Sequence, residues 1–342
     1  MKYILTPKNF TVRELFNPKL GESGKYYYYV LEKEGISHKE AKKRIGVKAW
    51  FCGVKDKNAS TKQWFCTEEP VDDSNTPEFR VKFRGNSSER IFVGKHKGNV
   101  FNVIVDFEEG EEKIIKHFKA SNELVCNYFG EQRFSKNNVE VARIIAKSDY
   151  ELALKTFLTK SSKFDTPKST KIKEIVASNW GNWEKIMQDK EIKETKKIEL
   201  FEYLKNNPSN FKDAFLHAEP KSVKILIKTA QAMRFNEKLN ELAKEKKPNN
   251  IYAQIVGQND KEVEFALSSS KAFTRELSVE PTEFEKKFRK GTLIRRTFFA
   301  AGKFNARRLK DNKFELSFEL GRGQYATVFL KFLNAWLAKN KL

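Results

Sequence analysis

Residues 53–64 read Gly-Val-Lys-Asp-Lys-Asn-Ala-Ser-Thr-Lys-Gln-Trp and lie between two runs that have the character of β-strands. The segment contains one carboxylate, Asp56, between Lys55 and Lys57. Neighbouring positive charge favours the ionised form of a carboxyl group, so we expect Asp56 to be charged. An ionised aspartate is suited to act as a nucleophile or as a base. The structural alternative is a lysine-rich surface hairpin with Asp56 in its turn.

The overall composition indicates a folded protein with an anionic partner. The chain has 342 residues, 39% of them hydrophobic, which is enough for two domains with sizeable cores. Its formal net charge is +21. Such an excess favours nucleic acid as the partner, and the lysines beside Asp56 would offset the repulsion of a phosphate backbone. The alternative is a cationic surface that serves only solubility.

No motif indicates a metal, a cofactor or a membrane. The three cysteines lack metal-ligand spacing, and the four histidines are scattered, so we expect buried thiols in a reducing compartment and no metal site. Neither a phosphate-binding loop nor a dinucleotide glycine cluster is present. No apolar run approaches the ~18 residues of a membrane span, and the start is too short for a signal peptide. We therefore expect a cytoplasmic protein without a cofactor.

Strand-like patterns dominate the first 108 residues, with one helix. Ser37 is expected to cap this helix through Arg44, with Glu40 at the capping-box position. Gly98-Asn99 predicts a turn between the last two strands. Alternation and β-branched or aromatic content predict strands over residues 10–15, 26–31, 50–54, 63–67, 79–83, 90–93 and 100–107.

The pattern becomes helical from Glu111 and returns to strands near the end. Residues 159–175 are lysine-rich and contain Pro167, which favours a loop. This order predicts an α+β fold in which a helix-rich insertion interrupts a sheet domain. Helices are expected over 111–120, 139–158, 178–246 and 326–342, and strands within 251–267 and over 313–320.

A second segment, residues 127–134, reads Asn-Tyr-Phe-Gly-Glu-Gln-Arg-Phe. Aromatic rings beside Arg133 are groups that proteins use to stack an unpaired base. The structural alternative is a helix C-terminus with Gly130 at the C′ position and its aromatic residues in the core.

Both segments resemble signatures of the TruD family of RNA pseudouridine synthases. Residues 53–63 are similar to its Gly-x-Lys-Asp-Lys/Arg-x-Ala-x-Thr-x-Gln motif, and residues 127–134 to its Asn-Tyr-Phe-Gly-x-Gln-Arg-Phe motif. The chain departs from the family where Ile4 replaces a basic residue, although Lys2 is nearby, and at Asn9 and Ser135, which replace Asp and Gly. Three weaker resemblances occur in the family's order, at 94–101, 231–236 and 320–327.

The resemblance implies a fold and a set of site residues. A pseudouridine-synthase-like catalytic domain with a mixed or antiparallel sheet is expected over 1–149 and 301–342, interrupted by a helix-rich α/β insertion over 150–300. Asp56 takes the place of the catalytic aspartate. The implied substrate-binding residues are Asn127, Phe129, which would stack on the target base, Tyr325, Lys55, Lys57 and Arg133.

The implied activity is the isomerisation of a uridine to pseudouridine in structured RNA, without a cofactor. The expected target is position 13 in the D-arm of tRNA. The alternative is a catalytically silent RNA-binding protein, such as a tRNA chaperone, that retains the scaffold. Candidates to bind phosphates, or else to be merely solvated, are the lysines of 160–173 together with Arg295, Arg296, Arg307 and Arg308.

Overall fold

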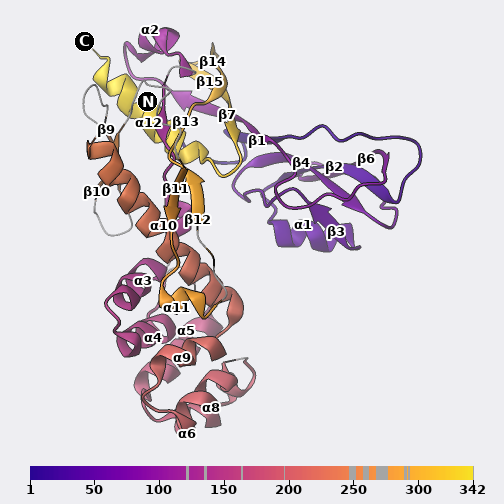
Figure 1. Ribbon diagram of the computed structural model, residues 1–342. Helices are drawn as coiled ribbons and strands as arrows, with labels where there is room; N and C mark the ends of the chain where they lie inside the picture. Colours follow the sequence, from indigo (N-terminus) through magenta and orange to yellow (C-terminus); the bar gives the residue numbers. More distant parts are fainter. Residues whose placement is uncertain are drawn as a thin grey trace.

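The computed structural model describes residues 1–120, 123–134, 137–162, 165–195, 197–245, 252–256, 262–266, 276–288, 291 and 293–341. A nine-stranded sheet and a group of helices lie at opposite ends of the molecule, and the long helix α10 (Pro220–Glu245) runs between them (Figure 1). This arrangement confirms the predicted α+β class.

The nine-stranded sheet is mixed and includes both ends of the chain. Its strand order is β14-β15-β7-β1-β4-β2-β6-β5, and β3 pairs with β4. β1 and β4 are parallel, whereas β15 pairs antiparallel with β7 along its whole length. The strands are β1 (Phe10–Leu15), β2 (Tyr26–Glu34), β3 (Ala49–Phe51), β4 (Ser60–Thr67), β5 (Ser74–Thr76), β6 (Phe79–Ser87), β7 (Gly98–Asp106), β14 (Gly302–Arg308) and β15 (Lys313–Gly321).

The predicted pairing of residues 90–93 with 100–107 around a turn at Gly98 is wrong. Residues 90–93 form no strand, and Gly98 is the first residue of β7, which lies between β1 and β15. A Cβ atom on Gly98 would lie 2.2 Å from the carbonyl oxygen of Leu320. Glycine is therefore required here by the close approach of β15 and not by a turn.

The helix predicted after Ser37 is confirmed. α1 (His38–Ile45) begins where the Ser37 hydroxyl accepts a hydrogen bond from the Glu40 N–H, at 3.1 Å. At the other end of the chain, α12 (Ala326–Lys339) packs on the sheet, where the Phe318 and Phe329 ring centroids are 4.5 Å apart. The short elements before the helical region are α2 (Glu111–Ile114), η1 (Ile115–His117), β8 (Val125–Cys126) and η3 (Glu131–Phe134).

The helical region has its own hydrophobic core, built around residues such as Trp183, Phe201 and Phe215. The helix predicted over 139–158 is two helices, which separate at Ser148, where φ is 61°. The helices of this region are α3 (Asn138–Ala146), α4 (Tyr150–Thr159), α5 (Pro167–Ser178), α6 (Trp183–Gln188), α7 (Lys190–Lys193), α8 (Ile198–Asn206), α9 (Phe211–Ala214), η4 (Phe215–His217) and the first part of α10.

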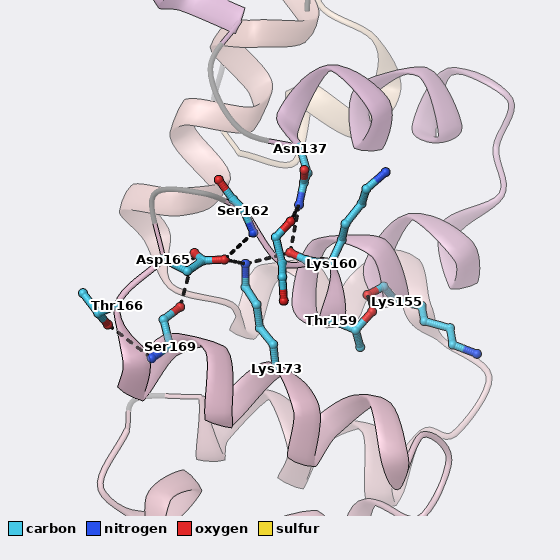
Figure 2. Close-up of polar contacts among 10 residues, drawn as sticks. Asn137, Lys155, Thr159, Lys160, Ser162, Asp165, Thr166, Ser169 and Lys173 are labelled. Atoms are coloured by element: carbon cyan, nitrogen blue, oxygen red, sulfur yellow. Dashed lines mark hydrogen bonds and ion pairs between the residues drawn. The ribbon is translucent and has the colours of Figure 1, made fainter. Parts of the chain in front are cut away.

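The loop predicted over residues 159–175 is wrong, because α5 begins within it. Proline is well suited to the first turn of a helix, where its missing N–H has no helical partner. Thr166 caps this turn by accepting a hydrogen bond from the Ser169 N–H, at 3.2 Å. Lys173 donates to Asp165 and to the Lys160 carbonyl, both at 2.7 Å, and so links α5 to the end of α4 (Figure 2).

Short strand pairs complete the structure. β9 (Tyr252–Val256) pairs with β10 (Glu262–Ala266), which confirms strand structure in the described part of 251–267. The remainder of that range, and Leu342 at the end of the last predicted helix, lie outside the described residues. β11 (Glu276–Val279) pairs with β12 (Leu293–Arg296), α11 (Glu283–Lys286) lies between them in the sequence, and β13 (Phe298–Phe299) pairs with β8. Among the described helices, none combines the length and apolar character that crossing a bilayer requires.

Candidate active site

Asp56 lies at the surface, in the loop between β3 and β4. Hydrogen bonds to its carboxylate and to its carbonyl hold this loop. The Asp56 carboxylate accepts a hydrogen bond from the Asn58 N–H at 3.0 Å, which shapes a local turn. The Asp56 carbonyl accepts from the Lys33 ammonium at 2.9 Å, and Lys33 also donates to the Ile36 carbonyl at 2.8 Å. Lys33 is 2% exposed, and burial lowers its pKa although Asp56 acts in the opposite direction. A buried ammonium therefore anchors the loop.

Sequence reasoning did not identify Lys33, although the pattern of β2 contained a clue. Alternate residues of a strand share one face, so Tyr29, Leu31 and Lys33 point the same way, and all three are buried. A lysine in a position that the alternation reserves for the core is rare unless it has partners. This lysine therefore marks an internal polar contact.

The two lysines that flank Asp56 differ in environment. Lys55 is buried, and its ammonium lies 2.6 Å from the Glu14 carboxylate, which also accepts from the Trp64 N–H at 2.9 Å. Lys57 is exposed. The positive charge of Lys55 is thus balanced inside the protein, whereas that of Lys57 faces solvent.

The other motif residues support the loop unequally. The Thr61 hydroxyl donates to the carbonyl of Lys33 at 3.4 Å, and the Lys33 ammonium in turn donates to the loop at Asp56. Gln63 is fully buried, and its amide atoms have no hydrogen-bond partner among the residues that the structure describes. Thr61 therefore supports the loop only indirectly, through Lys33, and Gln63 makes no hydrogen bond to it among the described residues.

Asp56 lines a cavity of about 460 Å³. One wall is the sheet, through Phe10 and Val12 of β1 and through Asn99 and Phe101 of β7. The other lining residues come from the N-terminal segment, the Asp56 loop, His96 and the turn into α12: Leu5, Gly53, Val54, Lys55, Asn58, His96, Gly323, Gln324, Tyr325, Ala326 and Thr327. Asp56 is the only acid among these described lining residues, so a single carboxylate faces this space.

Phe129 of the second segment packs against Tyr325. The Phe129 and Tyr325 ring centroids are 6.3 Å apart, and the Arg295 guanidinium lies 4.2 Å from the Phe129 ring centroid. Phe129 is 8% exposed and is not among the described residues that line the cavity. Arg133 lies 5.6 Å from the same ring. The structure therefore brings Tyr325 directly to Asp56's cavity and Phe129 to its border.

Arg295 holds the segment 127–134 through hydrogen bonds to Asn127. It donates to the Asn127 carbonyl at 2.9 Å and to the Asn127 side chain, whose amide in turn donates to the Arg296 carbonyl at 2.9 Å. Burial lowers the pKa of Arg295 to about 10. Asn127 is 4% exposed, so its polar atoms serve contacts within the protein. The sequence had suggested Arg295 only as a phosphate contact.

The backbone of this segment differs from the structural alternative. Residues 127–134 follow the short strand β8, so the interpretation of Gly130 as the end of a helix is wrong. A Cβ atom on Gly130 would lie 3.3 Å from the Thr327 hydroxyl and 3.5 Å from the Tyr325 ring. Glycine therefore permits the segment to approach the turn that lines the cavity.

Most of the basic residues suggested as phosphate contacts have partners in the protein. Arg308 donates to the Asn312 side chain, and the exposed Arg296 lies beside the half-buried Arg295. Near the start of the sequence, Ile4 is 71% exposed. The ion pairs are Lys160 with Glu140, Lys168 with Glu191 and Glu194, Lys171 with Glu191, Lys173 with Asp165, and Arg307 with Glu315.

One cluster has the residue types of a metal site but not its chemistry. Ligand atoms of Glu14, Cys52 and His96 lie within 4.8 Å of one another. Metal ligation requires the cysteine thiolate, whereas burial raises the pKa of Cys52 to about 12. Glu14 is already paired with Lys55. These donors therefore suit a buried thiol beside an ion pair better than a metal ion.

Comparison with known proteins agrees with this geometry. The family model described as tRNA pseudouridine synthase D (TruD) matches residues 5–276. The Methanococcus maripaludis protein named Probable tRNA pseudouridine synthase D 1 is 26% identical, over 97% of this chain and 98% of that protein. The Aquifex aeolicus tRNA pseudouridine synthase D is 28% identical, over 64% of this chain and 60% of its own length.

A solved structure shares the fold. The crystal structure of a Methanosarcina mazei TruD protein is similar with a TM-score of 0.63 at 18% identity, and the match covers 97% of this chain and 93% of that one. The match of the family model extends over most of the sequence and includes both the Asp56 loop and the Phe129 segment. The chain therefore belongs to the tRNA pseudouridine synthase D (TruD) family of RNA pseudouridine synthases, which isomerise uridine to pseudouridine.

Proposed function

We propose that this enzyme isomerises a uridine of tRNA, at position 13 in the D-arm, and that Asp56 is its catalytic carboxylate. The main support is the position of Asp56, which is the only acid among the described residues that line the cavity, in a loop anchored by the buried Lys33. Tyr325 lines the same cavity. A carboxylate beside an aromatic ring suits chemistry on a nucleotide that has left its stack.

The reaction rearranges bonds without losing atoms. The bond between uracil N1 and ribose C1′ breaks, the base turns, and a bond forms between C5 and C1′. C5 releases its proton and N1 takes one up, so no oxidant, reductant or group donor is required. Asp56 would begin the reaction either by attacking the substrate or by removing a sugar proton. None of the other described residues that line the cavity carries a carboxylate.

The aromatic residues would compensate for extracting the base. Unstacking a nucleotide costs a few kcal/mol, and stacking on an aromatic side chain returns about 1–3 kcal/mol per base. We assign this role to the pair Tyr325 and Phe129, whose ring centroids are 6.3 Å apart. Asn127 and Arg133 would position these rings, and the exposed Lys57 would contact phosphate.

We also propose that the catalytic unit comprises residues 1–149 and 301–342, with an insertion over 150–300. The helical region has a hydrophobic core of its own, which supports an insertion, while Ala232, Phe235 and Leu239 of α10 pack in the core on the sheet side. α3 contributes Val141 and Ala142 to the helical core, so the junction between the two units lies in this part of the chain. The insertion would extend the surface available to a large RNA.

Mapping pseudouridine in total tRNA treated with the purified chain tests the proposal. Asp56→Asn keeps the size of the side chain and removes its charge, so we expect a loss of about 10³-fold in rate, equivalent to about 4 kcal/mol of barrier. Binding of tRNA should stay within about 3-fold, because phosphate contacts dominate affinity. Asp72→Asn, at an exposed position of the same sheet region, serves as the control.

Two outcomes would contradict the proposal. If Asp56→Asn turns over like the wild type, Asp56 is not the catalytic group. If the wild type binds tRNA but forms no pseudouridine, the chain is an RNA-binding protein that retains only the scaffold. Pseudouridine at a position other than 13 would correct the target and leave the role of Asp56 intact.

A further inference from the structure

Two buried polar atoms in the Asp56 cavity lack a partner. Nδ1 of His96 and Oδ1 of Asn99 are buried without a hydrogen bond to any described residue, and both side chains line the cavity. His96 is only 9% exposed. Buried polar atoms of native proteins almost always have a partner, so each exception needs an explanation. A ligand that supplies the missing hydrogen bonds is such an explanation.

The backbone that carries both side chains is held in place before any ligand arrives. The segment around His96 is anchored by the Gly94 N–H, which donates to the Cys52 carbonyl at 2.7 Å, and by the Lys97 N–H, which donates to the Leu15 carbonyl at 2.9 Å. Asn99 belongs to β7, which is paired on both sides. Groups fixed on rigid elements are typical of sites that position a ligand.

The charge of this pair favours a neutral ligand. Burial, together with the positive charges of Lys55 and Arg322, lowers the pKa of His96 to about 4. His96 is therefore neutral at pH 7 and offers one donor and one acceptor, and Asn99 offers both as well. Lys55 is already neutralised by Glu14. Phosphate is normally bound by free Arg and Lys side chains, so these groups suit a base better than a phosphate.

We propose that His96 and Asn99 hydrogen-bond the polar edge of the target uracil and hold the base beside Asp56. The inference rests on the proposed function and adds the residues that recognise the base. The edge of uracil presents O2 as an acceptor, N3–H as a donor and O4 as an acceptor. Oδ1 of Asn99 can accept from N3–H, and the His96 ring can donate to a carbonyl oxygen.

The chemistry of the isomerisation makes this edge suitable for continuous binding. Turning uracil by half a revolution about the line through N3 and C6 brings C5 to the place of N1 and exchanges O2 with O4. The order of acceptor, donor and acceptor along the edge is therefore the same before and after the turn. One fixed pair of side chains can thus bind the base in both substrate and product.

The test uses single-turnover kinetics with a tRNA transcript that contains the mapped target uridine. His96→Phe and Asn99→Ala should each lower the rate about 10-fold or more, the effect of one lost hydrogen bond in a buried site, while tRNA affinity stays within about 3-fold. His96→Gln, which restores a donor, should retain more of the rate than His96→Phe. Asn102→Ala is the matched control, because Asn102 lies on β7 but does not line the cavity.

A change in the substrate gives a second measurement that does not depend on how the variants fold. Replacing the target with 3-deazauridine removes the N3–H donor at nearly constant shape. We expect the resulting loss of rate to be at least about 5-fold larger for the wild type than for Asn99→Ala, because the two changes remove the same contact. Equal losses, or wild-type rates for both His96→Phe and Asn99→Ala, would overturn this inference alone. A wild type that forms no pseudouridine would overturn the proposed function and this inference with it.

Discussion

Replacing Lys33 with methionine tests how the Asp56 loop is held. The substitution keeps a long side chain in a position that is 2% exposed and removes the ammonium that donates to the Asp56 and Ile36 carbonyls. Neither carbonyl accepts a hydrogen bond from another described residue, so the substitution isolates these two contacts. The expected results are a less stable sheet region and a slower reaction.

The magnitude follows from the two contacts. A buried acceptor left without a partner costs about 1–3 kcal/mol. The Ile36 contact is buried and bears this cost in full, whereas the Asp56 carbonyl is partly accessible and can bond to water. The net desolvation cost of the ammonium disappears with the charge. We therefore expect Lys33→Met to lower the free energy of unfolding by about 1–3 kcal/mol, the cost of roughly one orphaned group.

Urea unfolding and single-turnover pseudouridine formation measure the two effects. The reaction should slow by about 10-fold or more, because the loop no longer holds the carboxylate in one geometry. Lys62→Met is the matched control, since Lys62 lies on the adjacent strand with a 44% exposed side chain in a surface ion pair with Glu32. Such pairs contribute about 0–1 kcal/mol. If Lys33→Met matches Lys62→Met in both stability and rate, the anchoring role of Lys33 is refuted.

Three other predictions concern the framework of the site. Gly98→Ala should destabilise the sheet by about 3 kcal/mol or more, because the new Cβ would lie 2.2 Å from the Leu320 carbonyl oxygen. Gly21→Ala is the control, because its Cβ would lie 3.9 Å from the nearest atom, and equal urea midpoints for the two variants would contradict the prediction. Arg295→Lys should cost about 2–4 kcal/mol through its lost fork contacts, and the exposed Arg296→Lys little, as thermal unfolding would show. Stability should fall as the pH decreases from 6.5 towards about 4, because the unfolded chain protonates His96 while the folded chain excludes that proton. His96→Gln should reduce this slope in urea titrations across the same pH range, and an unchanged slope would show that other groups cause it.

Local features of the fold were accessible from the sequence. The cap at Ser37, the strands around the Asp56 loop and the final strand and helix depend on neighbouring residues, whose patterns the chain itself displays. The start of α5 was missed because Pro167 was interpreted as a break, although proline also begins helices. Local patterns therefore failed where one residue type has two structural uses.

Contacts between distant segments were not accessible. Gly98 was assigned to a turn because its actual constraint, the backbone of Leu320, lies near the other end of the chain. Arg295 could be identified only as a charge, because its burial against Asn127 and Phe129 depends on strands that pair late in the sequence. Such roles follow from which surfaces meet, and residue spacing contains little information about that.

From the amino-acid order alone came the α+β class, the candidate carboxylate and the family, because each depends on short runs whose chemistry is local. Tertiary structure alone decided that β15 lies beside β7 in the sheet, that Lys55 is neutralised while Lys57 meets solvent, and that His96 and Asn99 share a cavity with Asp56. Burial and pairing are properties of the assembled molecule, since they arise only when remote segments exclude water together.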